Sequence, residues 1–385
     1  MRILLVTGIY PPDIGGPAVY TKMIAEEFNA RGHMVTVVTY ADGGESHGKQ
    51  APWGGRVYSI SRSSFWLFRH IRFFATVFRE ARKHEVIYAQ DPMNTALASW
   101  FAGVVWRKKF VVKIIGDYAW EQGMQRFGVT DLLDIFLTKR YGFAVEILRL
   151  FERFSAKRAS RVIVPSIYLK TVVQKWGVEG KLITVIYNAV SLPDVTYSFE
   201  DARRLVHING YIILSVGRLV PWKGFEMLIR SMPDIQAKIP DAHLLIIGSG
   251  PEEAHLKKTV QDLGLEKSVS LLGGKSHSDL VTYISAADIF LLNTGYEGLS
   301  HQLIEVMSIG CPIITTDVGG NKEIVRAGDN AVVVGYNDRE AWKEAILHIR
   351  NNPHIGMNIR NNQKLQNTFP TREEVIIQTL ATLQL

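Results

Sequence analysis

The chain has 385 residues, of which 47% are hydrophobic and 21% are charged, a composition typical of a soluble globular protein. At this length, two hydrophobic cores and therefore two domains are expected. The single cysteine, Cys311, excludes a disulfide framework and any site built from several cysteines, and it points to a reducing compartment. No apolar run reaches about 18 residues, so no membrane-spanning helix is expected.

The net charge of +7 is unevenly distributed along the chain. Residues 1–190 hold 26 Lys and Arg against 15 Asp and Glu, a balance of +11, whereas residues 191–385 hold 18 against 22, a balance of −4. This asymmetry predicts that the first half meets an anionic partner, either a phosphate-bearing molecule or a membrane surface. Nucleic acid is not supported, because the sequence lacks helix-turn-helix, zinc-finger and RNP-like patterns.

The first half alternates short apolar runs with helical patterns. Met1–Gly8 is too short for a signal peptide and is interpreted as the first buried strand. Buried parallel strands are predicted at Ile3–Val6, Met34–Val38, Val86–Ala89, Phe110–Ile115 and Val162–Val164. Helices are predicted at Ala18–Ala30, Phe65–Lys83 and Val145–Ala159. Strands separated by helices of this length form a parallel sheet with crossover helices.

The turn after the first strand carries the first candidate binding residues. Gly15 and Gly16 precede a helix, and glycine lets a ligand approach the backbone amides at a helix amino end. The turn is neither a Walker loop nor Gly-x-Gly-x-x-Gly, and a simple tight turn is the alternative. The missing Gly-x-Gly-x-x-Gly also argues against a nicotinamide-dependent dehydrogenase.

The predicted helix Phe65–Lys83 combines aromatic and basic residues at helical spacing. One broad apolar side is formed by Trp66, Leu67, Ile71, Phe73, Phe74, Val77 and Phe78, and the other side holds Arg69, Arg72, Arg79 and Lys83. This composition is typical of a helix lying in a membrane interface. An ordinary helix that covers the sheet and exposes a basic face is the alternative. A second basic and aromatic segment is Lys139–Phe143 with Leu148–Lys157.

The second half begins a new series of strands and helices after a joint at Tyr187–Asp194. Strands are predicted at Tyr211–Val216, His243–Ile247, Val269–Leu271, Ile289–Leu292, Ile313–Thr315 and Ala331–Val334. Helices are predicted at Gly224–Met232, Pro251–Leu263, Ser276–Ala286 and Gln302–Ser308. Two such open α/β domains, with facing strand ends, would form a ligand cleft.

Two cations lie in the turn after the strand Tyr211–Val216. Arg218 can donate paired hydrogen bonds to phosphate oxygens, and Lys223 can supply a point charge. Two solvated surface cations are the alternative, but phosphate-type turns in both halves favour diphosphate binding. Turns at Gly248–Pro251 and Leu272–Ser276 could present backbone amides to a nucleobase, or their glycines could simply shape loops.

Glu297 and Glu305 flank the turn between the strand Ile289–Leu292 and the following helix. Ligands bind at the carboxyl ends of strands in open α/β sheets. A carboxylate there can accept hydrogen bonds from two neighbouring hydroxyls, as on a ribose or a hexose. One capping acid and one surface acid are the alternative.

Together these features resemble the retaining glycosyltransferases of family 4. The resemblance covers essentially the whole chain and rests on Glu297-x7-Glu305, Gly217-Arg218-Leu219-x3-Lys223-Gly224 and the turn ending Gly15-Gly16-Pro17, with Val164-Pro165-Ser166 and Asn188-Ala189-Val190 as weaker landmarks. It implies the α/β GT-B architecture, in which two Rossmann-like, doubly wound parallel-sheet domains face a cleft. Residues 1–190 would form the acceptor-side domain and 191–368 the nucleotide-sugar domain, with a helix in 369–385 returning to the first domain.

The resemblance also implies roles for individual residues. Arg218 and Lys223 would hold the donor diphosphate and stabilise its departing charge, Glu297 would hold hydroxyls of the transferred sugar, and Glu305 would hold the ribose. The other donor-binding candidates are Gly15 and Gly16 at the diphosphate, Gly298, Leu299 and Ser300 at the sugar or phosphate, and Gly250, Gly273 and Lys275 at the base.

Asp117 is the candidate acid of the first domain, at a position where the family commonly has a histidine or an acid. It could orient the acceptor or stabilise a developing positive charge, or it could cap the following helix. His301 is interpreted as a helix-start residue at the cleft wall, and His33 and His277 are interpreted as structural.

The implied reaction moves a hexose-type sugar from a UDP- or GDP-sugar to a glycan or lipid-linked acceptor. No Asp-x-Asp motif occurs in the sequence, which favours catalysis without a metal or other cofactor. The protein is expected in the cytoplasm, at the inner face of the membrane if the basic first half binds lipid. The alternatives are a non-hydrolysing nucleotide-sugar epimerase and a non-catalytic nucleotide-sugar binding protein.

Overall fold

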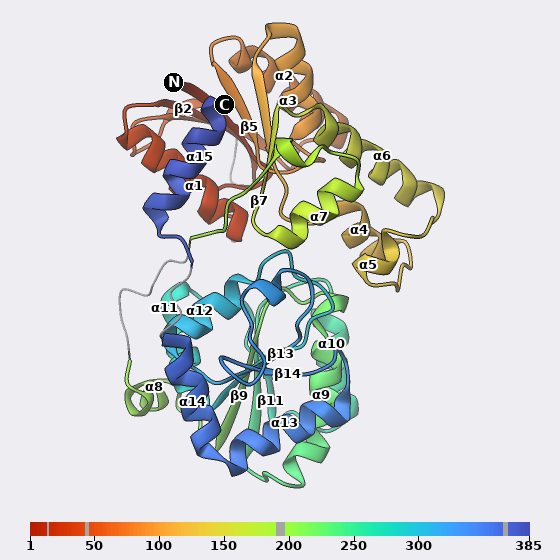
Figure 1. The fold of residues 1–385 in the computed structure, drawn as a ribbon, viewed down its shortest axis with the longest axis vertical. Helices are drawn as coiled ribbons and strands as arrows, with labels where there is room; N and C mark the ends of the chain where they lie inside the picture. The colour runs from red at the N-terminus through yellow and green to blue at the C-terminus, as the bar shows by residue number, and fades with distance from the viewer. Residues whose placement is uncertain (14, 43–45, 190–196, 365–368) are drawn as a thin grey trace. The chain divides into compact units, whose positions relative to one another are not determined.

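The structure is a computed structural model that describes residues 1–13, 15–42, 46–189, 197–364 and 369–385. The chain divides into two compact units (Figure 1). Unit 1 contains Met1–Val129, Ile135–Tyr187 and Pro370–Leu385, and unit 2 contains Thr130–Asp134 and Asn188–Phe369. The chain therefore passes from the main part of unit 1 to the main part of unit 2 between Tyr187 and Asn188. Most of the joint predicted at Tyr187–Asp194 lies outside the described residues.

Unit 1 is built on an eight-stranded sheet in the order β3-β4-β2-β1-β5-β6-β7-β8. Its strands are β1 (Arg2–Val6), β2 (Met34–Ala41), β3 (Ser46–Gln50), β4 (Arg56–Ser61), β5 (Val86–Ala89), β6 (Lys109–Lys113), β7 (Arg161–Val164) and β8 (Ile183–Val185). All neighbouring strands are parallel except β3, which runs antiparallel to β4 at one edge. The five predicted strands are confirmed, and β3, β4 and β8 are additional.

The helices of unit 1 connect and cover these strands. They are α1 (Gly16–Ala30), α2 (Trp66–Ala81), α3 (Ala96–Trp106), α4 (Tyr118–Arg126), α6 (Phe143–Arg158), α7 (Ile167–Lys175) and α15 (Arg372–Gln384), with a 3-10 turn at Gly180–Leu182. A short helix, α5 (Leu133–Phe136), spans a division between the units. The last helix, α15, packs on α1, where Arg372 and Glu27 form an ion pair at 3.0 Å.

Unit 2 is built on a six-stranded, fully parallel sheet in the order β11-β10-β9-β12-β13-β14. Its strands are β9 (Tyr211–Val216), β10 (Ala242–Ile247), β11 (Val269–Leu271), β12 (Ile289–Leu292), β13 (Ile313–Thr315) and β14 (Val332–Val333). Its helices are α8 (Phe199–Val206), α9 (Phe225–Gln236), α10 (Glu253–Asp262), α11 (His277–Ala286), α12 (His301–Ile309), α13 (Arg339–Asn351) and α14 (Pro353–Lys364), with 3-10 turns at Pro221–Lys223 and Gly319–Glu323. All six predicted strands and four predicted helices are confirmed.

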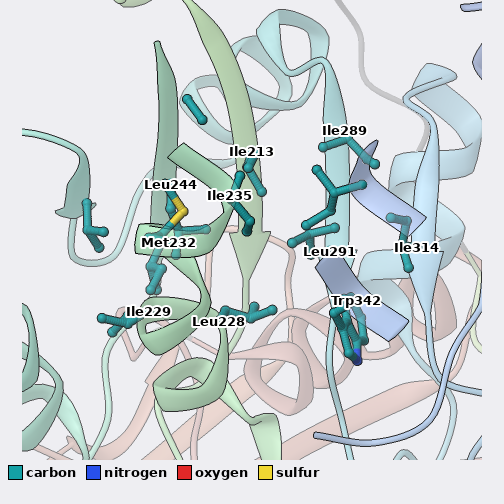
Figure 2. Close-up of a cluster of buried hydrophobic side chains, with 14 of the residues drawn as sticks. Ile213, Leu228, Ile229, Met232, Ile235, Leu244, Ile289, Leu291, Ile314 and Trp342 are labelled. Atoms are coloured by element: carbon teal, nitrogen blue, oxygen red, sulfur yellow. The ribbon is translucent and has the colours of Figure 1, made fainter. Parts of the chain in front are cut away.

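The core of unit 2 fixes the strands that lead into the predicted donor residues. Figure 2 shows Ile213 of β9, Ile289 and Leu291 of β12, and Ile314 of β13 among the buried side chains that face helix α9 and Trp342 of α13. Burying an aliphatic side chain of this size contributes roughly 1.5–3 kcal/mol. This packing holds the carboxyl ends of β9 and β12, so that the turns after them leave the sheet from fixed positions.

Candidate active site

The turn between β9 and α9 contains both predicted diphosphate-binding cations. Arg218 is exposed, and its guanidinium carbon lies 5.4 Å from the centre of the Trp222 ring. Lys223 ends the 3-10 turn and is buried. Gly224 follows with φ of +56°, and a Cβ atom there would lie 2.1 Å from Nδ2 of Asn293. Only glycine fits at this position, and it lets the turn approach the end of β12 closely.

Lys223 and Glu297 form a buried ion pair at the centre of this region. The Nζ atom of Lys223 lies 2.5 Å from Oε1 of Glu297, and the two side chains are 10% and 11% exposed. The backbone also joins the two turns, because the amide of Gly295 donates to the carbonyl of Trp222 at 2.7 Å. The structure thus brings together two of the side chains that were predicted to hold the diphosphate and the sugar.

Asn293, which sequence reasoning missed, connects the turn after β9 to Asn337. Its Nδ2 donates to the carbonyl of Gly224 at 2.9 Å and to Oδ1 of Asn337 at 2.7 Å. Its Oδ1 accepts from the amide of Asn337 at 3.0 Å. The side chain is fully buried, and these bonds satisfy both its donor and acceptor groups. The signal available in the sequence was a polar residue directly after a fully apolar strand.

A second missed feature is the Gly319-Gly320 pair after β13. A Cβ atom on Gly319 would lie 2.2 Å from the carbonyl oxygen of Glu297, and one on Gly320 would lie 2.2 Å from that of Gly298. The amide of Gly320 donates to the carbonyl of Glu297 at 2.9 Å. The Gly-Gly pair therefore sets the backbone position from which the Glu297 side chain reaches Lys223.

Glu305 lies on helix α12 and faces a histidine from α11. Nε2 of His277 is 2.8 Å from Oε1 of Glu305, an ion-pair distance that lacks hydrogen-bond geometry. Burial raises the pKa of Glu305, and the charge of His277 opposes that shift. The interpretation of His277 as structural did not include its contact with Glu305. Its signal was its place at the first position of the helix after β11.

The residues between the two acids are used mainly to start helix α12. Leu299 and Ser300 are buried, and Oγ of Ser300 accepts a hydrogen bond from the amide of Leu303 at 3.3 Å. This is an N-cap contact of the kind that favours Ser at this position. His301 is exposed at the helix start, as predicted, and its Nε2 lies 2.9 Å from Nδ2 of Asn188.

The residues predicted near the base have structural explanations. A Cβ atom on Gly250 would lie 2.4 Å from the carbonyl oxygen of Leu219, so glycine is required where this loop packs on the β9 turn. Gly273 adopts φ of +67°, and its carbonyl accepts from the amide of Gly248 at 2.9 Å. Lys275 is exposed, with Nζ 5.9 Å from the centre of the Tyr283 ring. These contacts fit the alternative of loop-shaping glycines.

In unit 1, the glycine turn leads directly into helix α1. Gly15 is the N-cap residue with φ of +155°, and Gly16 is the first helical residue. A Cβ atom on Gly16 would meet no atom within 4 Å, so space remains around the backbone at the helix start. Arg62 fixes the preceding segment, donating to the carbonyl of Gly8 at 2.9 Å and pairing with Asp13 at 2.6 Å.

Asp117 caps helix α4, which confirms the alternative given for this residue. Its Oδ1 accepts from the amide of Trp120 at 2.8 Å, and the residue is 1% exposed. Glu152 accepts from the amides of Tyr118 and Ala119 at 2.9 and 3.2 Å, so two carboxylates share one helix start. Burial raises the pKa of Asp117 to about 6, and burial with the nearby Asp117 charge raises that of Glu152 well above its usual value.

Among residues 1–13, 15–42, 46–189, 197–364 and 369–385, no group of three or more His, Cys, Asp or Glu side chains could hold a metal ion. Within the same ranges, no helix combines the length and the apolar character needed to cross a bilayer.

Comparisons with known proteins identify family matches for both halves of the chain. The family model for glycosyl transferases group 1 matches residues 199–366, and the glycosyl transferase 4-like domain matches residues 15–189. An uncharacterized glycosyltransferase of Methanocaldococcus jannaschii is 29% identical, over 87% of this chain and 85% of its own length. The GDP-mannose-dependent alpha-(1-6)-phosphatidylinositol monomannoside mannosyltransferase of Mycolicibacterium smegmatis is 24% identical, over 89% and 88%.

Solved structures match the fold over essentially the whole chain. HepE of Anabaena, crystallised with UDP and glucose, aligns with a TM-score of 0.80 and 20% identity, over 100% of this chain and 99% of its own. WaaG, a glycosyltransferase involved in lipopolysaccharide biosynthesis, aligns with a TM-score of 0.74 and 17% identity, over 97% and 98%. These matches show that the chain has the GT-B fold.

The two family models leave residues 190–198 between them unmatched and together match most of the chain. The chain belongs to the glycosyl transferases group 1, with a first half of the glycosyl transferase 4-like type, and it is a hexosyltransferase.

Proposed function

We propose that this glycosyltransferase moves a hexose from a UDP- or GDP-sugar to a glycan or lipid-linked acceptor, with retention of the anomeric configuration and without a metal ion. The observation that carries the proposal is the buried pair of Lys223 and Glu297 beside the exposed Arg218. UDP in the Anabaena structure and GDP-mannose in the name of the mycobacterial relative support either nucleotide.

Lys223 and Glu297 can bind the diphosphate and the sugar of the donor at the same time. An ammonium group has three donors, so Lys223 can reach a diphosphate oxygen while it keeps its bond to Glu297. Glu297 retains acceptor capacity for a sugar hydroxyl. Arg218 adds a guanidinium that can bind two phosphate oxygens, and Glu305 takes the ribose hydroxyls. From unit 1, we assign a backbone amide at Gly15 or Gly16 to the diphosphate.

In the proposed reaction, the bond between the anomeric carbon and the diphosphate oxygen breaks, and the diphosphate keeps the electron pair. The acceptor oxygen forms its bond to the same face of the sugar, and its proton passes to the departing phosphate oxygen. Positive charge grows on the sugar and negative charge on the diphosphate, so Arg218 and Lys223 stabilise the transition state more than the bound donor. Asp117, which caps α4, is assigned a positioning role at the acceptor side.

The proposal is tested by binding and turnover measured separately. Thermal unfolding of the protein is measured with UDP, with GDP and with the glucose, mannose and N-acetylglucosamine conjugates of each. One of the two nucleotides, with its conjugates, should raise the unfolding temperature. Arg218→Gln should reduce turnover roughly 10²–10³-fold and leave folding unchanged, because the side chain is exposed. NMR of the product establishes whether the anomeric configuration is retained. Epimerised donor in the absence of any acceptor would instead support the epimerase alternative.

We further propose that the acceptor is presented at a membrane surface in the cytoplasm, as in polysaccharide biosynthesis on a lipid carrier. Unit 1 supports this with large apolar side chains that are exposed on α2, α3 and α6, helices that pack on one another (Figure 1). These side chains are Trp66, Leu67, Phe68, Ile71, Leu97, Phe101, Val104, Val105, Leu150 and Phe151. Arg82 lies over an aromatic ring of α3, and Arg158 lies over rings of α3 and α6.

Aromatic and basic residues at one surface are the composition of a peripheral membrane contact. The predicted apolar side of α2 is divided in the structure, because Phe73 and Val77 are buried against the sheet whereas Trp66 and Ile71 are exposed. Its basic side is partly neutralised, because buried Glu80 pairs with Arg79 and Lys83. Sedimentation with anionic vesicles at low and moderate salt tests the proposal, and absence of binding at both would contradict it.

A further inference from the structure

We propose that unit 2 holds a second ligand site, separate from the donor turns, and that this site binds a small oxyanion carried on an apolar ring. The site is a cavity of about 480 Å³. Its lining includes Phe199, Tyr211, Asp288, Pro312, Arg350 and Arg360. This volume lies in the range of pockets that hold small molecules.

The cavity lies at the amino ends of the strands whose carboxyl ends carry the donor residues. Tyr211, in the cavity wall, is the first residue of β9. Arg218 lies two residues after the last residue of the same strand. Asp288, also in the wall, precedes β12, and Glu297 follows it. At about 3.3 Å per residue, the six residues of β9 separate the two sites by roughly 20 Å. A ligand in the cavity would therefore not overlap a bound nucleotide.

Two arginines give the cavity its positive charge. The guanidinium carbon of Arg350 lies 5.4 Å from the centre of the Tyr211 ring, and that of Arg360 lies 6.0 Å from the centre of the Phe199 ring. Neither arginine forms an ion pair with an acid in the parts of the chain that the structure describes. Stacking on a ring holds a guanidinium in place and leaves its N–H groups available.

The acids of the lining do not cancel this charge. Asp288 is already occupied, because it forms an ion pair with Arg203 and accepts from the amide of Ile212 at 2.7 Å. Asp241 is exposed and supplies one negative charge against the two arginines. The excess positive charge favours an anion.

The rest of the lining selects what the anion is attached to. A phosphate or carboxylate can accept paired hydrogen bonds from a guanidinium. The lining also includes the rings of Phe199 and Tyr211 with Pro312 and Met357. Such a lining would remove a flat apolar ring from water. The expected ligand is therefore an aromatic or similarly apolar phosphate or carboxylate, not inorganic phosphate alone.

The full chain is titrated calorimetrically with phenyl phosphate, benzoate and inorganic phosphate at constant ionic strength. Burial of the ring should make phenyl phosphate bind at least about tenfold more tightly than inorganic phosphate. Arg350→Gln and Arg360→Gln should each weaken phenyl phosphate about tenfold. Benzoate affinity relative to phenyl phosphate distinguishes a carboxylate site from a phosphate site. The matched control is Arg204→Gln, an exposed arginine of α8 that pairs with Asp201 outside the cavity lining.

A second comparison separates this site from the proposed donor site. Arg218→Gln should weaken UDP and leave phenyl phosphate unchanged, and saturating UDP should not displace phenyl phosphate. The proposal is overturned if UDP competes with phenyl phosphate, if only Arg218→Gln affects phenyl phosphate, or if the wild-type chain binds none at millimolar concentration. Because UDP and phenyl phosphate are measured independently, failure of either site leaves the other standing.

Discussion

Lys223 and Glu297 are charged side chains that are about nine-tenths removed from water, so each depends on the other. Lys223→Met would leave the Glu297 carboxylate buried without a counter-ion, at an expected cost of about 3 kcal/mol in the free energy of unfolding. The same change removes the cation that we assign to the departing diphosphate, and it should lower turnover roughly 10²–10³-fold. Urea denaturation and initial rates of sugar transfer measure the two effects.

The double variant Lys223→Met/Glu297→Gln separates stability from catalysis. With both charges removed, no buried ion is left unpaired, and most of the lost unfolding free energy should return. Turnover should stay low, because the cation is still missing. Recovery of turnover in the double variant would mean that the pair has only a structural role.

Glu305 should make nucleotide affinity depend on pH. In the proposed role, its carboxylate must be ionised to accept hydrogen bonds from two ribose hydroxyls, and burial raises its pKa above the usual 4.5. UDP or GDP affinity should therefore fall as pH decreases, beginning at a higher pH than for an ordinary glutamate. His277→Gln removes the charge that opposes the shift, so the loss should begin at a still higher pH. Calorimetric titration with UDP or GDP from pH 5 to 8 checks this. Identical pH profiles for the wild type and His277→Gln would show that His277 does not influence the ionisation of Glu305.

At the scale of elements, the start of helix α4 should make folding depend on pH. The pKa of Asp117 is about 6 in the folded chain against an ordinary 3.8, so the folded state holds this proton more tightly than the unfolded state. Its contribution to the free energy of unfolding is therefore greatest below about pH 4, decreases as pH rises to about 6 and is constant above. For Asp117 this difference in the free energy of unfolding is roughly 3 kcal/mol.

Asp117→Asn tests this and the role of Asp117 together. Asn keeps a side-chain oxygen that can accept from the amide of Trp120, but it carries no charge. The variant should be more stable than the wild type at pH 8 and show less dependence between pH 4 and 6. If Asp117 only positions α4, turnover should remain within a few-fold. A roughly 10²-fold loss would indicate that the carboxylate itself takes part in the reaction.

Helix α2 shows where sequence periodicity was sufficient and where it was not. The pattern predicted a helix with an apolar side, and the helix is present at Trp66–Ala81. It did not predict that only the second half of that side would be covered, because burial depends on where the sheet ends beneath it. The strand β3 was missed for a related reason: Ser46–Gln50 is polar and exposed at a sheet edge, without the apolar run that marks a buried strand.

The exposed start of α2 allows a test of the proposed membrane contact. Trp66→Ser/Phe68→Ser should reduce binding to anionic vesicles at least about tenfold, since each side chain carries roughly 2 kcal/mol of burial energy. Both residues are exposed, so folding should be unaffected. Leu205→Ser, an equally exposed apolar residue in unit 2, is the control and should not change binding. Equal binding by all three proteins would place the membrane contact elsewhere.

At the scale of the whole molecule, the alternation of apolar runs with helical patterns predicted the α/β class and most elements of unit 2. Lys223 and Glu297 could each be predicted to follow a strand, and they meet because those strands, β9 and β12, are neighbours in the sheet. Asn293 and the Gly319-Gly320 pair could not, because their roles arise from backbone segments that approach only after folding. The pairing of Arg203 with Asp288 was hidden for the same reason, since 85 residues separate them.

Each unit has its own sheet and its own buried cluster, so calorimetry should resolve two unfolding transitions. A nucleotide at 100 times its Kd should stabilise unit 2 by roughly 2.7 kcal/mol and raise its transition by about 5–10 °C. Deleting residues 370–385 should lower the other transition by at least about 10 °C, because α15 buries Val375, Ile376 and Leu383 in unit 1. The control Ile377→Ser, at an exposed position of α15, should move neither transition. A single transition that both the nucleotide and the deletion shift would mean that the two units unfold cooperatively.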